Sequence, residues 1–213
     1  MANAQRAYLP AAGKDWLLPF YDPLVKLSGA DRVRRKLFDQ AGIRPGDRVL
    51  DIGCGTGTLA VLIKQRVPDT DVVGLDPDPK ALARAHRKAQ RAHVSVQFDQ
   101  GFADALPYAD ASIDRVLSSL MLHHLPTEAK RKALREVRRV LKPGGSFHLL
   151  DFSEPKAHLH RFSDLMHKLH AHQLQDNTEE RLLGWMREAG FVHPRITGTG
   201  RLLGQITYFT ASV

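Results

Sequence analysis

The chain has 213 residues and contains a single cysteine, Cys54, so it cannot form an intrachain disulfide. No stretch approaches the roughly 20 consecutive apolar residues that a membrane-spanning helix needs. The first eight residues also lack the apolar core of a signal peptide. These absences exclude a small scaffold held by disulfides, and they lead us to expect a cytoplasmic protein.

The length suits one α/β domain with a full core and is too short for two ordinary domains. The net charge of +8 is of the sign that attracts nucleic acid, a membrane surface or acidic substrates. However, the basic residues concentrate in segments 84–91 and 130–139, which read as outer helices, and such runs are usually solvated faces. We therefore expect no nucleic-acid partner. A weak contact with an anionic membrane surface stays open, and so does the oligomeric state.

Segment 49–58, VLDIGCGTGT, joins an apolar strand to a helix through a glycine loop. Gly53, Gly55 and Gly57 lack Cβ, so a ligand can touch the backbone where the helix starts. A dinucleotide-binding GxGxxG loop would place its third glycine where Thr58 stands, and a P-loop would need a Gly-Lys-Ser/Thr sequence that is absent. The segment therefore predicts a nucleotide pocket that neither motif describes well.

Strands and helices are predicted to alternate along the rest of the chain. The expected strands lie near 48–52, 71–75, 94–98, 113–119, 146–152, 191–197 and 205–212. The expected helices lie near 30–41, 57–66, 79–91 and 127–141, and a further one opens at 177–180 and ends at Gly190. Because the strands are nearly continuous apolar runs, the pattern predicts an α/β fold with a parallel sheet covered on both faces.

Three further segments follow the glycine loop in a fixed order: VVGLD at 72–76, GFADALP at 101–107 and RRVLKPGGS at 138–146. The four together resemble the class I S-adenosylmethionine (SAM) methyltransferases over roughly residues 30–152, and most of all the group that includes the ubiquinone/menaquinone biosynthesis C-methyltransferases. The resemblance implies a Rossmann-like seven-stranded sheet in the order 3-2-1-4-5-7-6 with the last strand antiparallel. It also implies one domain over 1–213, with an N-terminal cap segment at about 1–29 and a lid insertion at about 153–176.

The resemblance implies SAM as the cofactor and S-adenosylhomocysteine as its product. Asp76 would accept hydrogen bonds from both ribose hydroxyls. Many relatives carry an acidic residue at the place of Phe102 to bind the adenine amino group, so here either Asp104 replaces it or stacking and backbone groups near Ala103 hold the base. The predicted cofactor residues are Asp51, Gly53, Cys54, Gly55, Gly57, Asp76, Pro77, Phe102, Ala103 and Ser118.

Methyl transfer from a sulfonium is an in-line displacement with an activated donor, so the enzyme supplies alignment, exclusion of water and sometimes a base. No metal is required.

His123 and His124 follow the fourth strand, where the acceptor would sit, and either one acts as a base or both brace the loop. The predicted substrate contacts are Trp16, Phe20, Tyr21 and Asp151. The five histidines between 158 and 172 favour a lid over a metal site.

Together these motifs predict a SAM-dependent methyltransferase that acts on a small molecule. The acceptor classes left open are a quinone precursor, a lipid and a secondary metabolite. RNA methylation, suggested by the charge, and SAM binding without catalysis are the alternatives.

Overall fold

A computed structural model describes residues 29–153, 177–202 and 204–213, and it contains a seven-stranded sheet in the order β3-β2-β1-β4-β5-β7-β6. Strands β3, β2, β1, β4 and β5 run parallel to their neighbours, whereas β7 is antiparallel to both β5 and β6. The predicted order and the antiparallel last strand are therefore confirmed. The strands are β1 (Arg48–Ile52), β2 (Asp71–Asp76), β3 (Gln97–Gln100), β4 (Ile113–Ser119), β5 (Leu141–Phe152), β6 (Val192–Arg201) and β7 (Gln205–Ser212).

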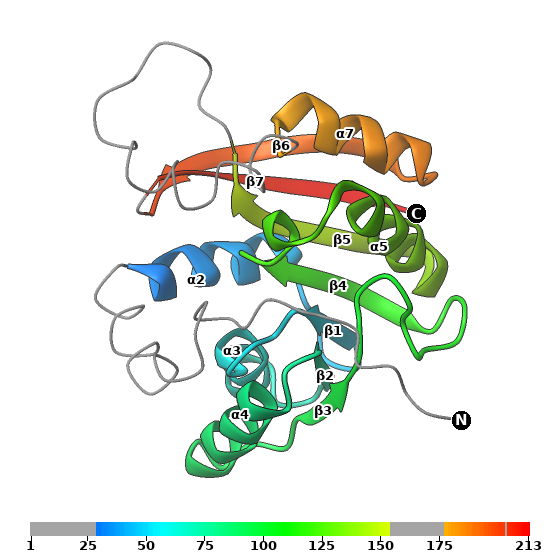
Figure 1. Ribbon diagram of the computed structural model, residues 1–213. Coiled ribbons are helices and arrows are strands. Elements are labelled where there is room, and N and C mark those ends of the chain that lie inside the picture. Colours follow the sequence, from blue (N-terminus) through cyan, green and yellow to red (C-terminus); the bar gives the residue numbers. More distant parts are fainter. Residues whose placement is uncertain (1–28, 154–176, 203) are drawn as a thin grey trace, which may run out of the picture.

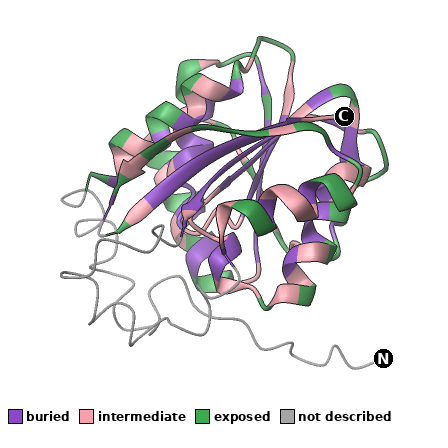
Figure 2. Ribbon diagram, turned by 90° about the horizontal axis from the view of Figure 1, so that it is seen from above, coloured by how far each residue is buried: buried purple, intermediate pink, exposed green. Residues whose placement is uncertain are grey.

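Helices cover both faces of the sheet, as Figures 1 and 2 show. Helices α2, α3 and α4 pack on one face, and α5 and α7 pack on the other. The helices are α2 (Ala30–Ala41), α3 (Thr58–Arg66), α4 (Pro79–Arg91), the 3-10 helix η2 (Leu122–His124), α5 (Thr127–Val140) and α7 (Glu179–Glu188). Among the described residues, none of these helices has the length and apolar character needed to cross a bilayer.

Two apolar cores follow from the alternation of side chains along each strand. Leu50 and Ile52 of β1 face the core shared with α5 and α7, while Val49 faces the core shared with α2, α3 and α4. All three side chains are at most 2% exposed. Burying a side chain of this size contributes about 1.5–3 kcal/mol, so both faces of β1 hold it inside the molecule and fix where the glycine loop emerges.

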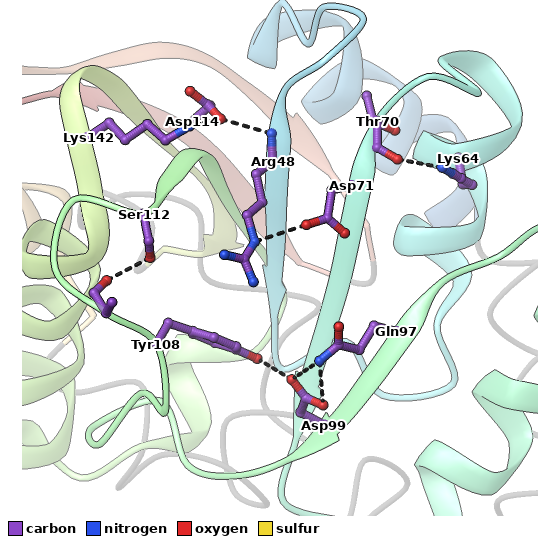
Figure 3. A network of polar contacts seen from close by, with 11 residues as sticks. Arg48, Lys64, Thr70, Asp71, Gln97, Asp99, Tyr108, Ser112, Asp114 and Lys142 are labelled. Atoms are coloured by element: carbon purple, nitrogen blue, oxygen red, sulfur yellow. Dashed lines mark hydrogen bonds and ion pairs between the residues drawn. The ribbon is translucent and has the colours of Figure 1, made fainter.

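Charged side chains hold the amino ends of the central strands together (Figure 3). The Arg48 backbone N–H and the Lys142 ammonium both donate to Asp114 Oδ2, at 2.9 and 2.7 Å, and the Arg48 guanidinium lies 3.0 Å from Asp71. These groups are partly exposed, so each pair contributes only about 0.2–1 kcal/mol. The opposite, carboxyl ends of the same strands carry the buried polar groups described below.

Three strand boundaries differ from the prediction by three or more residues: the starts of β3 and β5, and the end of β6, which runs to Arg201 instead of residue 197. Strand β3 begins at Gln97 instead of residue 94, because the Val94 N–H donates to Ala89 O at 3.1 Å and ends the preceding helix. His93, with φ +54°, turns the chain there. Strand β5 begins at Leu141 instead of residue 146, because Leu141 already pairs with Ile113 before a shift in register.

Candidate functional site

In the glycine loop between β1 and α3, another side chain occupies the space beside Gly53, whereas the space beside Gly55 is open. A Cβ added at Gly53 would lie 2.1 Å from Met121 Cγ, so the Met121 side chain covers that side of the loop. At Gly55 no atom of the described residues lies within 4 Å of the corresponding position. Both residues have positive φ, +68° and +52°, which glycine adopts without strain. A ligand can therefore approach the backbone at Gly55.

The loop is held by contacts from neighbouring elements. The backbone N–H groups of Gly53 and Cys54 donate to Leu75 O at 2.8 and 3.0 Å. From α4, the Lys88 ammonium donates to Thr56 Oγ1 at 2.9 Å and to Thr58 Oγ1 at 2.6 Å. The loop is thus shaped by the protein itself, which lowers the cost of ordering it around a ligand.

Cys54 points its sulfur into the protein. A Cβ on Gly74 would lie 2.9 Å from Cys54 Sγ, so the sulfur fills the space beside that glycine. Burial raises the pKa of the Cys54 thiol well above its usual range. A neutral, packed thiol is a poor nucleophile, and the geometry assigns the side chain to packing while its backbone remains part of the loop.

Asp76 ends β2 and is 7% exposed. Its Oδ2 accepts from the Gly55 N–H at 2.8 Å and its Oδ1 accepts from the Asp78 N–H at 2.9 Å. Burial raises the pKa of the Asp76 carboxyl, while these two N–H groups act against that rise. Each carboxylate oxygen can accept more than one hydrogen bond. Asp76 thus braces the glycine loop and keeps acceptor capacity for ligand hydroxyls. Pro77 follows it, half-buried.

Asp51, in β1, is 1% exposed, and its Oδ2 has no hydrogen-bond partner among residues 29–153, 177–202 and 204–213. Burial raises the pKa of Asp51 to about 7; the charge of Arg34 opposes this rise and that of Asp76 adds to it. A buried carboxylate oxygen without a donor is costly. The site is therefore suited to a ligand that brings a positive charge or a donor.

The loop that carries Phe102 and Ala103 is anchored to β3 and α5. The Tyr108 hydroxyl donates to Asp99 Oδ2 at 3.0 Å (Figure 3), and the Leu106 N–H donates to Glu136 Oε2 at 2.8 Å. Phe102 pairs with Ala105 in an isolated bridge. Phe102 and Ala103 are half-buried at the same end of the sheet as the glycine loop.

His123 and Asp151 form a buried pair at the carboxyl ends of β4 and β5. His123 Nδ1 lies 2.5 Å from Asp151 Oδ1, and the His123 backbone N–H donates to Asp151 Oδ2 at 2.9 Å. The Phe152 N–H also donates to Oδ1, at 2.7 Å. A carboxylate only accepts hydrogen bonds, so Nδ1 carries the hydrogen, and in the neutral imidazole Nε2 then presents a lone pair. The arrangement orients an imidazole as a proton acceptor.

Other predicted residues surround this pair. The rings of His123 and His124 have centroids 3.9 Å apart, and His124 is half-buried. Ser118 is 1% exposed, and its Oγ has no hydrogen-bond partner in the part of the chain that the structure describes. Asp151 itself is 0% exposed, behind His123. The structure therefore places Asp151 against His123. Asp151 would act on a substrate through the His123 ring.

Two buried cations were missed by the sequence analysis. Lys130 of α5 is 1% exposed and Arg34 of α2 is 8% exposed; the expectation that the basic run 130–139 is solvated is wrong for Lys130. Burial lowers the pKa of Lys130, and the charge of Asp151 opposes this. The sequence signal that could have identified them is their spacing along each helix, which places them on the same face as the buried apolar residues. The buried positions of the two helices are Lys130, Ala133, Leu134, Val137 and Val140 in α5 and Ala30, Arg34, Leu37 and Ala41 in α2.

Several predicted residues lie outside the described part of the chain. They are Trp16, Phe20, Tyr21 and the histidines between 158 and 172. The cap segment and the lid insertion stay predictions for the same reason. Within residues 29–153, 177–202 and 204–213, no three side chains of the metal-binding types gather at one place.

A sheet in this order, with a glycine loop after β1 and a buried carboxylate at the end of β2, defines the class I SAM-dependent methyltransferases. Residues 49–145 match the family model of a methyltransferase domain. The chain is 36% identical over 187 residues to a ubiquinone/menaquinone biosynthesis C-methyltransferase of Xanthomonas oryzae, covering 76% of this chain and 73% of that protein. The chain thus belongs to the family of the ubiquinone/menaquinone biosynthesis methyltransferases.

One further comparison agrees with this assignment, and another shows the same fold. A demethylmenaquinone methyltransferase of Thermus thermophilus is 40% identical over 142 residues, which is 65% of this chain and 64% of that protein. A SAM-dependent methyltransferase from Aquifex aeolicus shares the fold, with a TM-score of 0.66 and 19% identity over 89% of this chain and 96% of that chain. The chain spans only 58–64% of the length of three demethylmenaquinone methyltransferases.

Proposed function

We propose that this protein transfers the methyl group of SAM to a small-molecule acceptor, with a demethylated quinone as the first candidate. One observation carries the proposal: an open glycine loop and a buried histidine–aspartate pair lie at the same end of one sheet. The names of the relatives favour a quinone among the open acceptor classes.

Several residues fit the cofactor. Asp76 would accept from the ribose hydroxyls, Phe102 and Ala103 would border the adenine, and the loop backbone at Gly55 would lie along the ligand. The unpartnered oxygens of Asp51 and Ser118 match a ligand that brings its own donors. When bound, SAM supplies a methyl group attached to a sulfonium. The sulfonium sulfur is a good leaving group, so the methyl transfer needs no metal.

The chain's own contribution to the chemistry is a proton acceptor. His123 Nε2 would take the proton from the acceptor's acidic C–H or O–H, whose electron pair then forms the bond to the methyl carbon. Asp151 holds Nδ1–H in place and stabilises the imidazolium that results, as the carboxylate does in other histidine–aspartate pairs. Its second oxygen, bonded to the His123 backbone, fixes the residue as well as the ring.

The test is a panel assay of S-adenosylhomocysteine release with quinone-like phenols, amines, lipids and RNA. Release with the phenols or another small acceptor supports the proposal. Release with RNA alone would replace it with RNA methylation. Binding of SAM without release on any acceptor would favour a non-catalytic SAM-binding protein.

A further inference from the structure

A buried amide lies close to the histidine–aspartate pair. Asn177, which comes just before α7, is 0% exposed, and its Nδ2 donates to Phe152 O at the end of β5. The Phe152 N–H donates to Asp151 Oδ1, and the Phe152 ring meets the His123 ring edge-on, with centroids 5.1 Å apart. Phe152 thus contacts the Asn177 amide, the proton acceptor and the carboxylate that orients it.

One end of the Asn177 amide is bonded and the other is not. Its Oδ1 receives no hydrogen bond from any residue that the structure describes. The orientation of the amide is fixed, because Phe152 O can accept only from the NH₂ group and would repel the oxygen. The unpartnered atom is therefore an oxygen that only accepts. A buried carbonyl oxygen without a donor is destabilising unless a ligand supplies one.

The other polar side chains at this end of β5 and β7 bind each other. Thr207 pairs with Asp151 in the register of the two strands, and its Oγ1 donates to Glu179 Oε1 at 2.8 Å. Ser153 Oγ lies 2.8 Å from Thr207 Oγ1. None of these bonds reaches Asn177 Oδ1. The polar groups around the histidine–aspartate pair are thus satisfied within the protein, whereas this oxygen is left for a ligand.

The chemistry of this oxygen selects one kind of ligand group. His123 Nε2 would take the proton of one acidic group of the methyl acceptor. Asn177 Oδ1 can bind only a second group that donates, such as a hydroxyl, because an ether or carbonyl oxygen brings no hydrogen. A buried polar atom that a ligand leaves unpaired makes a site reject that ligand strongly.

We propose that Asn177 binds the methyl acceptor and determines its specificity: Oδ1 accepts from a hydroxyl that the acceptor carries besides the group that His123 deprotonates. This proposal rests on the proposed function and extends it to a residue outside the matched methyltransferase domain, 49–145. The acceptor class that fits is a dihydroxy aromatic compound. Phe152 O contributes by holding Nδ2 and so directing Oδ1.

The test measures S-adenosylhomocysteine release, without oxygen, from three acceptors that differ at one position. Naphthohydroquinone carries two hydroxyls, its monomethyl ether replaces one of them by an ether, and α-naphthol lacks the second oxygen and so controls for the bulk of the ether methyl. The variants are Asn177→Leu, which has a similar shape without a polar atom, and Asn177→Ala. Thr178→Ala is the matched control, because it removes the cap of α7 at the next residue and leaves the amide in place.

We expect the parent to favour the hydroquinone over both other acceptors at least about tenfold in kcat/KM. Asn177→Leu should reduce this preference to within about twofold, mainly through a loss on the hydroquinone, and Asn177→Ala serves if Asn177→Leu does not fold. Thr178→Ala should lower the melting temperature and keep the preference of the parent. Affinity for S-adenosylhomocysteine should stay within about twofold in the variants, because the cofactor does not need this oxygen.

Two results would overturn the proposal. One is a parent protein that uses the three acceptors equally well. The other is an Asn177 variant, Leu or Ala, that lowers kcat/KM for all three acceptors by the same factor, as a purely structural amide would. A parent that releases no S-adenosylhomocysteine with any acceptor contradicts the proposed function itself, so the two failures are distinguishable.

Discussion

Two fully buried aspartates near the carboxyl ends of parallel strands differ in one respect that separates their roles. Asp151 of β5 receives three N–H groups, from the His123 ring, the His123 backbone and Phe152. Asp51 of β1 keeps one oxygen without a donor from the described residues. Both are at most 1% exposed. The Asp151 carboxylate, with a donor on each oxygen, orients the groups that bind it, whereas the unpartnered oxygen of Asp51 is available to a ligand.

The comparison divides the site into two halves. At the end of β5, the protein gives both oxygens of Asp151 a donor and orients the His123 imidazole. In β1, it leaves one oxygen of Asp51 without a donor among the described residues, next to a glycine loop that neighbouring elements hold. We read the first half as the methyl-acceptor side and the second as the cofactor side, and the predictions below test that division.

The largest expected effect is on turnover in the acceptor half. His123→Ala should lower turnover about 10²–10⁴-fold, because the proton acceptor is lost. Affinity for S-adenosylhomocysteine should stay within about twofold, as calorimetry would measure. His124→Ala is the matched control, and a base at His123 predicts a much smaller loss there. A His123→Ala protein with normal turnover would point to an acceptor that needs no base, such as a phenolate or free amine.

Asp76→Ala should have the next largest effect, on cofactor affinity. It removes two expected hydrogen bonds to the ribose, each worth about 1.5–3 kcal/mol, and it frees the Gly55 N–H that Asp76 now holds. We expect S-adenosylhomocysteine to bind on the order of 10²-fold more weakly. Asp71→Ala, at the opposite end of the same strand, is the control. Equal affinity of Asp76→Ala and the parent would remove Asp76 from the cofactor site.

The affinity for S-adenosylhomocysteine should depend on pH through Asp51. Burial raises the pKa of Asp51 to about 7 in the free protein, with Arg34 on α2 and the Ala60 N–H on α3 acting against the rise and Asp76 on β2 adding to it. A ligand ammonium favours the ionised form, so binding must displace the proton below that pH. Affinity should therefore rise with pH by up to about tenfold per unit between pH 5.5 and 7 and then level off.

The same titration compares the two aspartates directly. Asp51→Asn should abolish the pH dependence, whereas Asp151→Asn should retain it. If Asp151→Asn removes the dependence and Asp51→Asn does not, the assignment of the two halves is reversed.

The smallest effect concerns stability of the loop. In Gly53→Ala and Gly55→Ala, an alanine must adopt the positive φ of the glycine that it replaces. This lowers the free energy of unfolding by about 1 kcal/mol in each variant. Only the Cβ at position 53 also overlaps Met121, which adds about 1–3 kcal/mol. Urea unfolding should show the larger loss for Gly53→Ala. A greater loss for Gly55→Ala would mean that the loop is not open there.

Much of the fold was predictable from the sequence. The strand–glycine loop–helix unit and the Asp78–Pro79 helix start are local signals, and the structure places β1, α3 and α4 within one residue of the predictions. The start of β3 was not predictable, because Val94 and Val96 form an apolar alternation typical of a strand. A backbone hydrogen bond from Val94 to the end of α4 decides against it.

The sequence allowed most of the site residues to be predicted, but not the contacts between them. The rule that ligands bind at the carboxyl ends of strands selected both Asp51 and Asp151. It did not show that Asp151 binds His123, because that pair depends on how η2 packs against β5. Arg34 and Lys130 were missed because arginine and lysine are rarely buried, although their helical spacing placed them on apolar faces.

The most direct test of the central claim is calorimetry of the unmodified chain with SAM and with S-adenosylhomocysteine. The account predicts that both bind at one site per chain and compete with each other. The absence of binding heat from either ligand at millimolar concentration would contradict it.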